Sequence, residues 1–159
     1  MSLPSTGNIR KPSPNGAKTF YKTSSPFEQK IGYYRGVRHG QHIFVAGTTA
    51  VNPHSASSAP QILHPGDAHK QTLAAFLECL QAVEALGGKQ GAPAESVVRV
   101  RMFVGRHEDC EAVADAFTHL FGGDDNSDVG AVATMLVVQN GFVNPDMMVE
   151  VEVDAMVDA

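Results

Sequence analysis

Strict alternation near the end of the chain constrains the fold more than any other feature. From Val149 to Asp154 the sequence reads Val-Glu-Val-Glu-Val-Asp. Successive side chains of a strand point to opposite faces, so this pattern predicts a strand with one apolar face and one acidic face. Three neighbouring carboxylates need water, cationic partners or a binding site beside them. We therefore expect the functional site on this acidic face.

Length and composition indicate one folded domain. The chain has 159 residues, of which 43% are hydrophobic, enough for a single core. Its two cysteines, Cys79 and Cys110, lie in helix-like patterns without metal-ligand spacing, which argues against a disulfide framework and a metal site. No apolar run approaches the roughly 20 residues that span a membrane, and the first basic residues are not followed by the short apolar core that a secretory signal requires. We expect a cytoplasmic protein without a cofactor or a membrane partner.

The N-terminal segment differs in composition from the rest. Residues 1–26 are rich in Pro, Ser and Gly and contain basic but no acidic residues. We expect a flexible basic extension over 1–26, followed by a domain over 27–159. A mitochondrial transit peptide is the alternative, although Pro4, Pro12 and Pro14 would break its amphipathic helix. The remainder is acidic, which disfavours binding of nucleic acid.

Hydrophobic periodicity predicts seven elements in the order β-β-α-β-α-β-β. Asp67 is the expected N-cap of the first helix, which should end at the glycine pair Gly87-Gly88. The predicted elements are strands Ile31–Arg38 and Gln41–Val51, a helix from Asp67 to Gly87, strand Val97–Val104, helix Glu108–Phe121, and strands Ala131–Val138 and Met147–Val157.

Interleaved strands and helices of this kind favour an α+β fold with one mixed sheet and both helices on one face. On the strand Val97–Val104 we expect Val98, Val100, Met102 and Val104 to face the core. The uncovered face mixes aromatic residues with charges of both signs, which suits a wet surface between subunits. We infer a homo-oligomer.

Four segments, in their order and spacing, resemble a known family. They are Ile31-Gly32-Tyr33, His42–Thr48, Ala131–Met135 and Glu150-Val151-Glu152. Together they resemble the RidA/YjgF family of reactive-intermediate deaminases, also called endoribonuclease L-PSP, over about residues 31 to 157. The resemblance implies a chorismate-mutase-like fold and a homotrimer whose sheets line a central barrel. It also implies pockets for a small-molecule metabolite at the subunit interfaces.

The resemblance further implies which residues form the pocket. Deaminating members hold the substrate carboxylate with the arginine of a Pro-Ala-Arg segment, which Ala131-Val132-Ala133 matches here. An alanine therefore stands at the arginine position, and Ala46 and Ala114 likewise replace polar family residues. Glu150 matches the glutamate that positions or activates the attacking water, and it is the candidate catalytic residue. The expected substrate-binding residues are Tyr33, Gly47, Thr48, Ala133, Thr134 and Met135.

Two interpretations of the acidic face remain open from the sequence. Glu150 either orients water or is an ordinary strand carboxylate paired with Arg99 or Arg101. The two arginines either replace the missing clamp or form structural pairs, for which Glu152 and Asp154 are the simpler partners.

We therefore predict a RidA-like trimer that binds a small apolar or weakly polar metabolite and lacks the carboxylate-dependent imine deaminase activity. Hydrolysis or hydration of a reactive imine, enamine or unsaturated intermediate is the reaction expected if it is an enzyme. The alternative is a non-catalytic ligand-binding, protective or interaction module.

Overall fold

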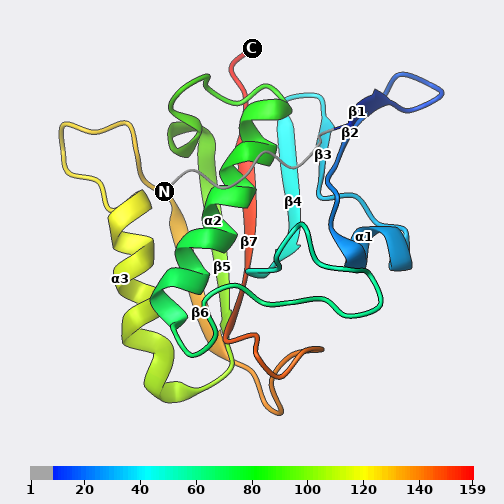
Figure 1. The fold of residues 1–159 in the computed structure, drawn as a ribbon. Coiled ribbons are helices and arrows are strands. Elements are labelled where there is room, and N and C mark those ends of the chain that lie inside the picture. Colours follow the sequence, from blue (N-terminus) through cyan, green and yellow to red (C-terminus); the bar gives the residue numbers. More distant parts are fainter. Residues whose placement is uncertain (1–8) are drawn as a thin grey trace.

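The computed structural model describes residues 9–159, which form one seven-stranded sheet with helices on one face (Figure 1). The strands are β1 (Ile9–Pro12), β2 (Lys18–Lys22), β3 (Gly36–His39), β4 (His42–Thr48), β5 (Val97–Val104), β6 (Val132–Val137) and β7 (Val149–Met156). Their order in the sheet is β1-β2-β3-β4-β7-β5-β6. Neighbouring strands are antiparallel except β5 and β6, which run parallel.

The helices are α1 (Pro26–Ile31), α2 (Ala68–Ala85) and α3 (Cys110–Phe121), with 3₁₀ turns at Pro93–Ser96 and His107–Asp109. From β3 onward the order β-β-α-β-α-β-β is the predicted one, which confirms the α+β fold class. Helix α2 packs on β4 and β7 and α3 packs beside it, so both cover the same face (Figure 1). No helix within residues 9–159 is both long and apolar enough to cross a membrane.

The core lies between this pair of helices and the sheet. The valines of β7 are all fully buried here, which confirms that the alternation marks one apolar face. Phe76 of α2 is also fully buried and stacks edge-on against Phe121 of α3, with ring centroids 5.0 Å apart. Each such buried side chain stabilises the fold by roughly 1.5–3 kcal/mol. Within residues 9–159, the opposite face of the sheet carries no helix, and it is called the open face below.

The ends of α2 follow the predicted signals. The Asp67 carboxylate accepts a hydrogen bond from the backbone N–H of Lys70 at 2.9 Å, so Asp67 is the N-cap. At the other end, Arg10 of β1 and Arg38 of β3 donate to the carbonyls of Ala85 and Leu86. Cations at a helix C-terminus complement the helix dipole, so the first strands of the sheet also stabilise this end of α2.

The N-terminal segment differs from the flexible extension expected over residues 1–26. Its first eight residues lie outside the described residues, but β1 and β2 form an antiparallel hairpin that adds two strands beside β3. The turn between them contains Asn15-Gly16, and Gly16 has φ of 71°, a conformation in which a Cβ would be strained. Pairing of the backbone with β3 offsets the low apolar content of this segment.

Two strand details also differ from the prediction. The first predicted strand was to begin at Ile31, but Ile31 ends α1, and Gly32, with φ of 88°, terminates that helix in the left-handed conformation. Strand β3 therefore begins only at Gly36. On β5 a bulge between Val97 and Arg99 breaks the alternation, so Val97 is buried and Val98 is 44% exposed rather than facing the core.

Candidate functional site

Glu150 lies on the open face, against the backbone of Gly47. A Cβ at position 47 would overlap the Oε1 atom of Glu150 and would lie 3.0 Å from its Cδ. Strand β4 lies next to β7 in the sheet, which brings these two predicted site residues together. Glycine at position 47 therefore makes room for the carboxylate.

The surroundings of Glu150 raise the pKa of its carboxyl group. The side chain is half-buried, and burial, together with the nearby charge of Glu152, raises the pKa of Glu150, while Arg35 opposes the rise. Among residues 9–159, no Lys, Arg or His forms an ion pair with this carboxylate. Glu150 can therefore exchange a proton closer to neutral pH than an exposed glutamate, as a general base must.

The other two carboxylates of the acidic face form ion pairs with β5. Arg101 contacts both Glu152 and Asp154, each at 3.1 Å, and Arg99 lies 3.8 Å from Asp154. These half-exposed pairs agree with the structural interpretation of both arginines. Thr134 lies opposite Arg101 in the β5–β6 pairing, so it shares this face. The Arg101 guanidinium is engaged by two carboxylates within its own chain.

A buried charge cluster that the sequence did not reveal lies behind Gly47. The Arg35 guanidinium is 3.0 Å from Glu28 of α1 and 3.1 Å from Glu78 of α2, and the side chains of Arg35 and Glu28 are almost completely buried. Arg35 also donates to the carbonyl of Gly47 at 3.0 Å and to the hydroxyl of Thr48 at 2.6 Å. The cluster thus joins two helices to the end of β4.

Charge and burial act together on this cluster. Burial alone would lower the pKa of the Arg35 guanidinium, but the charges of Glu78 and Glu28 help to raise it above its ordinary value. Burial raises the pKa of Glu78, against the effect of Arg35. Burial likewise raises the pKa of the Cys79 thiol to about 12, so this cysteine is a neutral core residue rather than a nucleophile.

Thr48 and Tyr33 differ in burial and in the side of the sheet that they face. Thr48 is fully buried, and its hydroxyl donates to the Ala46 carbonyl at 2.8 Å, so this side chain faces Arg35 rather than the open face where a ligand was expected. Tyr33 is half-buried, with its ring 5.8 Å from the Arg35 guanidinium carbon. It lines an open-face hollow of about 490 Å³, together with Ala46 and Glu152. Burial raises the pKa of its hydroxyl, which therefore stays protonated at neutral pH.

Ala133 and Met135 do not share the face of Glu150. Ala133 lies opposite Val100 and Met135 opposite Met102, and both of these β5 residues are buried under the helices. Paired residues on neighbouring strands project to the same face of a sheet. One chain therefore places Glu150 and Ala133 on opposite faces, and a pocket containing both would need a second copy of the chain.

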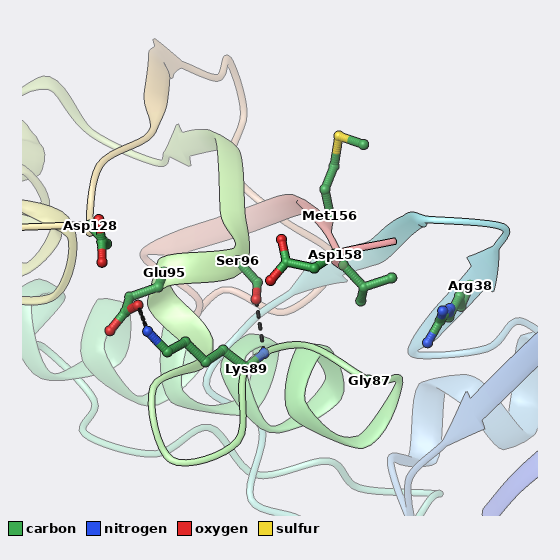
Figure 2. Close-up of a pocket in the computed structure, with 9 residues that line it drawn as sticks. Arg38, Gly87, Lys89, Glu95, Ser96, Asp128, Met156 and Asp158 are labelled. Carbon is green, nitrogen blue, oxygen red and sulfur yellow. Dashed lines mark hydrogen bonds and ion pairs between the residues drawn. The ribbon is translucent and has the colours of Figure 1, made fainter.

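A second hollow, of about 500 Å³, lies at the far end of β7 and is lined by none of the predicted site residues (Figure 2). Three of its charged side chains, those of Lys89, Glu95 and Arg38, already have partners. The Lys89 ammonium pairs with Glu95, the Lys89 backbone N–H donates to the Ser96 hydroxyl, and Arg38 donates to backbone carbonyls. Within residues 9–159, no cluster of His, Cys, Asp and Glu is arranged to hold a metal ion.

Comparison with known proteins places the chain in a family. Residues 23–157 match the model of the family described as Endoribonuclease L-PSP. Over 134 residues the chain is 34% identical to SCO2049 of Streptomyces coelicolor, an uncharacterized protein, covering 84% of this chain and 88% of that one.

Solved structures agree with this match. Rv2704 from Mycobacterium tuberculosis, a member of the YjgF/YER057c/UK114 family, superposes with a TM-score of 0.68 and 28% identity, covering 88% of this chain and 99% of that one. The YjgF gene product of E. coli superposes with a TM-score of 0.58 over 79% of this chain and 88% of that one. At 22% identity, that second likeness concerns the fold alone.

The fold and the family match thus define a protein of the YjgF type. The chain belongs to the endoribonuclease L-PSP family, which confirms the RidA/YjgF assignment made from the sequence.

Proposed function

We propose that this protein binds a small imine, enamine or similar unsaturated metabolite that carries no carboxylate, in pockets between the subunits of a homotrimer, and hydrolyses it with Glu150. The observation that carries the proposal is the position of Glu150. Its half-buried carboxylate packs on Gly47 and forms no ion pair within the described part of the chain. An unpaired carboxylate of this kind attracts a cationic or proton-donating group.

The arrangement of arginines supports a substrate without a carboxylate. Ala133 stands where the family resemblance implies the carboxylate-binding arginine. Arg101 is held by Glu152 and Asp154, and the buried Arg35 is held by two glutamates of its own. A bidentate clamp needs a guanidinium with two free parallel N–H groups facing the ligand. A substrate carboxylate would instead meet the negative charge of Glu150.

The proposed reaction adds water to the carbon of a protonated imine. Glu150 takes a proton from the water as the water oxygen bonds to the imine carbon, and the product of this step is a carbinolamine. The proton then passes from Glu150 to the nitrogen, and the C–N bond breaks to release ammonia. Glu150 takes the hydroxyl proton as the carbonyl forms and passes it to the ammonia, so that a carbonyl compound and ammonium leave. The raised pKa of Glu150 suits it to accept and return this proton closer to neutral pH than an ordinary glutamate would.

Three exposed apolar side chains of the edge strand β6 support a homotrimer. Val132 is 64% exposed, and Leu136 and Val137 are also exposed. Apolar surface of this kind favours burial against another chain. Within one chain, Ala133 and Met135 lie on the opposite face of the sheet from Glu150. A neighbouring copy would bring its own Ala133 and Met135 to the pocket of Glu150.

The test compares two imines that differ only in a carboxylate. The imine of ethylamine, formed by an amine oxidase, and the imine of alanine, formed by an amino-acid oxidase, are generated in situ, and release of ammonia is followed. Wild type, Glu150→Gln and Ala133→Arg are compared, and light scattering gives the oligomeric state of each.

We expect wild type to accelerate hydrolysis of the ethylamine imine only, and Glu150→Gln to abolish this while remaining trimeric. Ala133→Arg should gain activity on the alanine imine. Wild-type activity on the alanine imine would refute the assignment of substrate class. If wild type hydrolyses neither imine, catalysis is refuted, and the alternative of a non-catalytic ligand-binding module remains.

A further inference from the structure

The sheet is irregular at the point where Gly47 meets Glu150. Pairing of β4 with β7 is regular up to Val45 and resumes at Thr48, so Ala46 and Gly47 together face one residue of β7. This is a β-bulge, which interrupts the ladder and redirects the backbone of the bulged strand. The bulge therefore determines where the backbone beside the Glu150 carboxylate lies.

Arg35 and Thr48 hold both carbonyls of the bulge. Arg35 Nη1 donates to the Gly47 carbonyl at 3.0 Å and to Thr48 Oγ1 at 2.6 Å, and Thr48 Oγ1 donates to the Ala46 carbonyl at 2.8 Å. The C=O and N–H of a planar trans peptide point in opposite directions. Both flanking peptides therefore turn their N–H groups away from the Arg35 guanidinium and the Thr48 hydroxyl.

The guanidinium itself is fixed from two sides. Its Nε lies 3.0 Å from Glu28 and 3.1 Å from Glu78, on two different helices. Glu28 in turn accepts hydrogen bonds from the backbone N–H and the hydroxyl of Thr23, at 2.9 and 2.6 Å. A buried guanidinium with this many partners has one orientation, which it imposes on the bulge.

We propose that Arg35 and Thr48 are positioning residues of the Glu150 site, which hold the bulge at Ala46 and Gly47 in the shape against which the Glu150 carboxylate packs. Neither side chain needs to touch a ligand for this role. The proposal rests on the function proposed above for Glu150, but its structural part is testable without any substrate.

The test is a pH titration of the Glu150 side-chain carbon by NMR, in wild type and in Thr48→Val. Valine keeps the volume of Thr48 but removes the hydroxyl that links Arg35 to the Ala46 carbonyl. Thr72→Val is the matched control, because Thr72 is equally buried and its hydroxyl donates to the Ala68 carbonyl within α2. The charged groups acting on Glu150, namely Glu152 and Arg35, are unchanged in both variants.

In Thr48→Val the loosened bulge should admit water to the carboxylate, so the titration midpoint should move toward that of an ordinary glutamate. We expect a shift of about 0.5 pH unit, or about a threefold change in proton affinity, and no shift in Thr72→Val. Thr48→Ser, which restores the hydroxyl, should restore the midpoint. A folded Thr48→Val with the wild-type midpoint would overturn the proposal.

Arg35→Lys is the second variant, and it decides the question if Thr48→Val does not fold. A lysine keeps the charge but cannot contact two carboxylates and two oxygens of β4 at once. Its Glu150 midpoint should also move, and an unchanged midpoint would overturn the proposal. If wild type hydrolyses the ethylamine imine, Thr48→Val should lower kcat about tenfold with little change in KM, whereas equal losses in Thr72→Val would point to a general effect of stability.

Discussion

Substituting Gly47 by alanine tests the contact between β4 and Glu150 directly. The φ angle of Gly47 lies outside the left-handed region, so an alanine backbone is not strained there. The added Cβ would overlap Glu150 Oε1 and would lie 3.0 Å from Cδ and 3.5 Å from Cγ. The substitution therefore acts by displacing one side chain, and the effect should disappear when that side chain is removed.

The size of the effect follows from two opposing terms. Replacing glycine by alanine at an unstrained site stabilises a protein by about 0.5 kcal/mol, because the unfolded chain loses conformational freedom. Overpacking costs about 1–3 kcal/mol, and the half-exposed end of Glu150 can yield, so a cost of about 1.5 kcal/mol, in the lower half of that range, applies here. In wild type Gly47→Ala should destabilise by about 1 kcal/mol, and in Glu150→Ala it should stabilise by about 0.5 kcal/mol. The coupling energy is then about 1.5 kcal/mol.

Four proteins suffice for the measurement: wild type, Gly47→Ala, Glu150→Ala and the double variant. Urea unfolding at one protein concentration gives each free energy, because the stability of an oligomer depends on concentration. The coupling corresponds to about 3–6 °C in thermal midpoint for a chain of this size. Coupling below about 0.5 kcal/mol, the usual error of additivity, would show that Glu150 does not pack on Gly47.

Three further predictions concern single substitutions. Gln71 is fully buried and bonds the Asp146 carbonyl and the Met148 N–H, so Gln71→Met should cost about 2 kcal/mol, seen as a lower urea midpoint. The raised pKa means that Glu150 binds its proton more tightly in the folded protein than in the unfolded chain. Wild type should therefore lose stability relative to Glu150→Gln as the pH rises from the ordinary glutamate pKa through the raised one. A difference in unfolding free energy between the two proteins that does not change with pH would contradict this. Arg101→Met should cost less than about 1 kcal/mol, because its ion pairs are half-exposed.

Local signals in the sequence accounted for most of the fold. Alternation located β7, and the Asp67 cap with the following apolar stripe located α2. The β1–β2 hairpin was missed because composition was given more weight than the Asn15-Gly16 turn, a pair typical of hairpins. The bulge at Val97 and the short helix α1 depend on pairing and packing with distant strands, which alternation alone does not encode.

The site was only partly predictable for a related reason. Glu150 stood out because it belongs to a strict alternating run, and Gly47 because of the family resemblance. Glu28, Arg35 and Glu78 are far apart in the chain, and each alone looks like a surface charge. Only the packing of α1 and α2 against the end of β4 brings them together, and no short motif marks that meeting.

The two edge strands of the sheet, β1 and β6, differ in charge and hydrophobicity, and this difference affects the tendency of the protein to aggregate. The β1 edge carries Arg10, Lys11 and Pro12, residues that block pairing with a foreign strand, whereas the β6 edge is apolar and exposed at Val132 and Leu136. Among the described strands, the β6 edge is therefore the one at which another chain can more readily add to the sheet. Removal of the first strand would expose the backbone of β2 and leave a second edge open to aggregation.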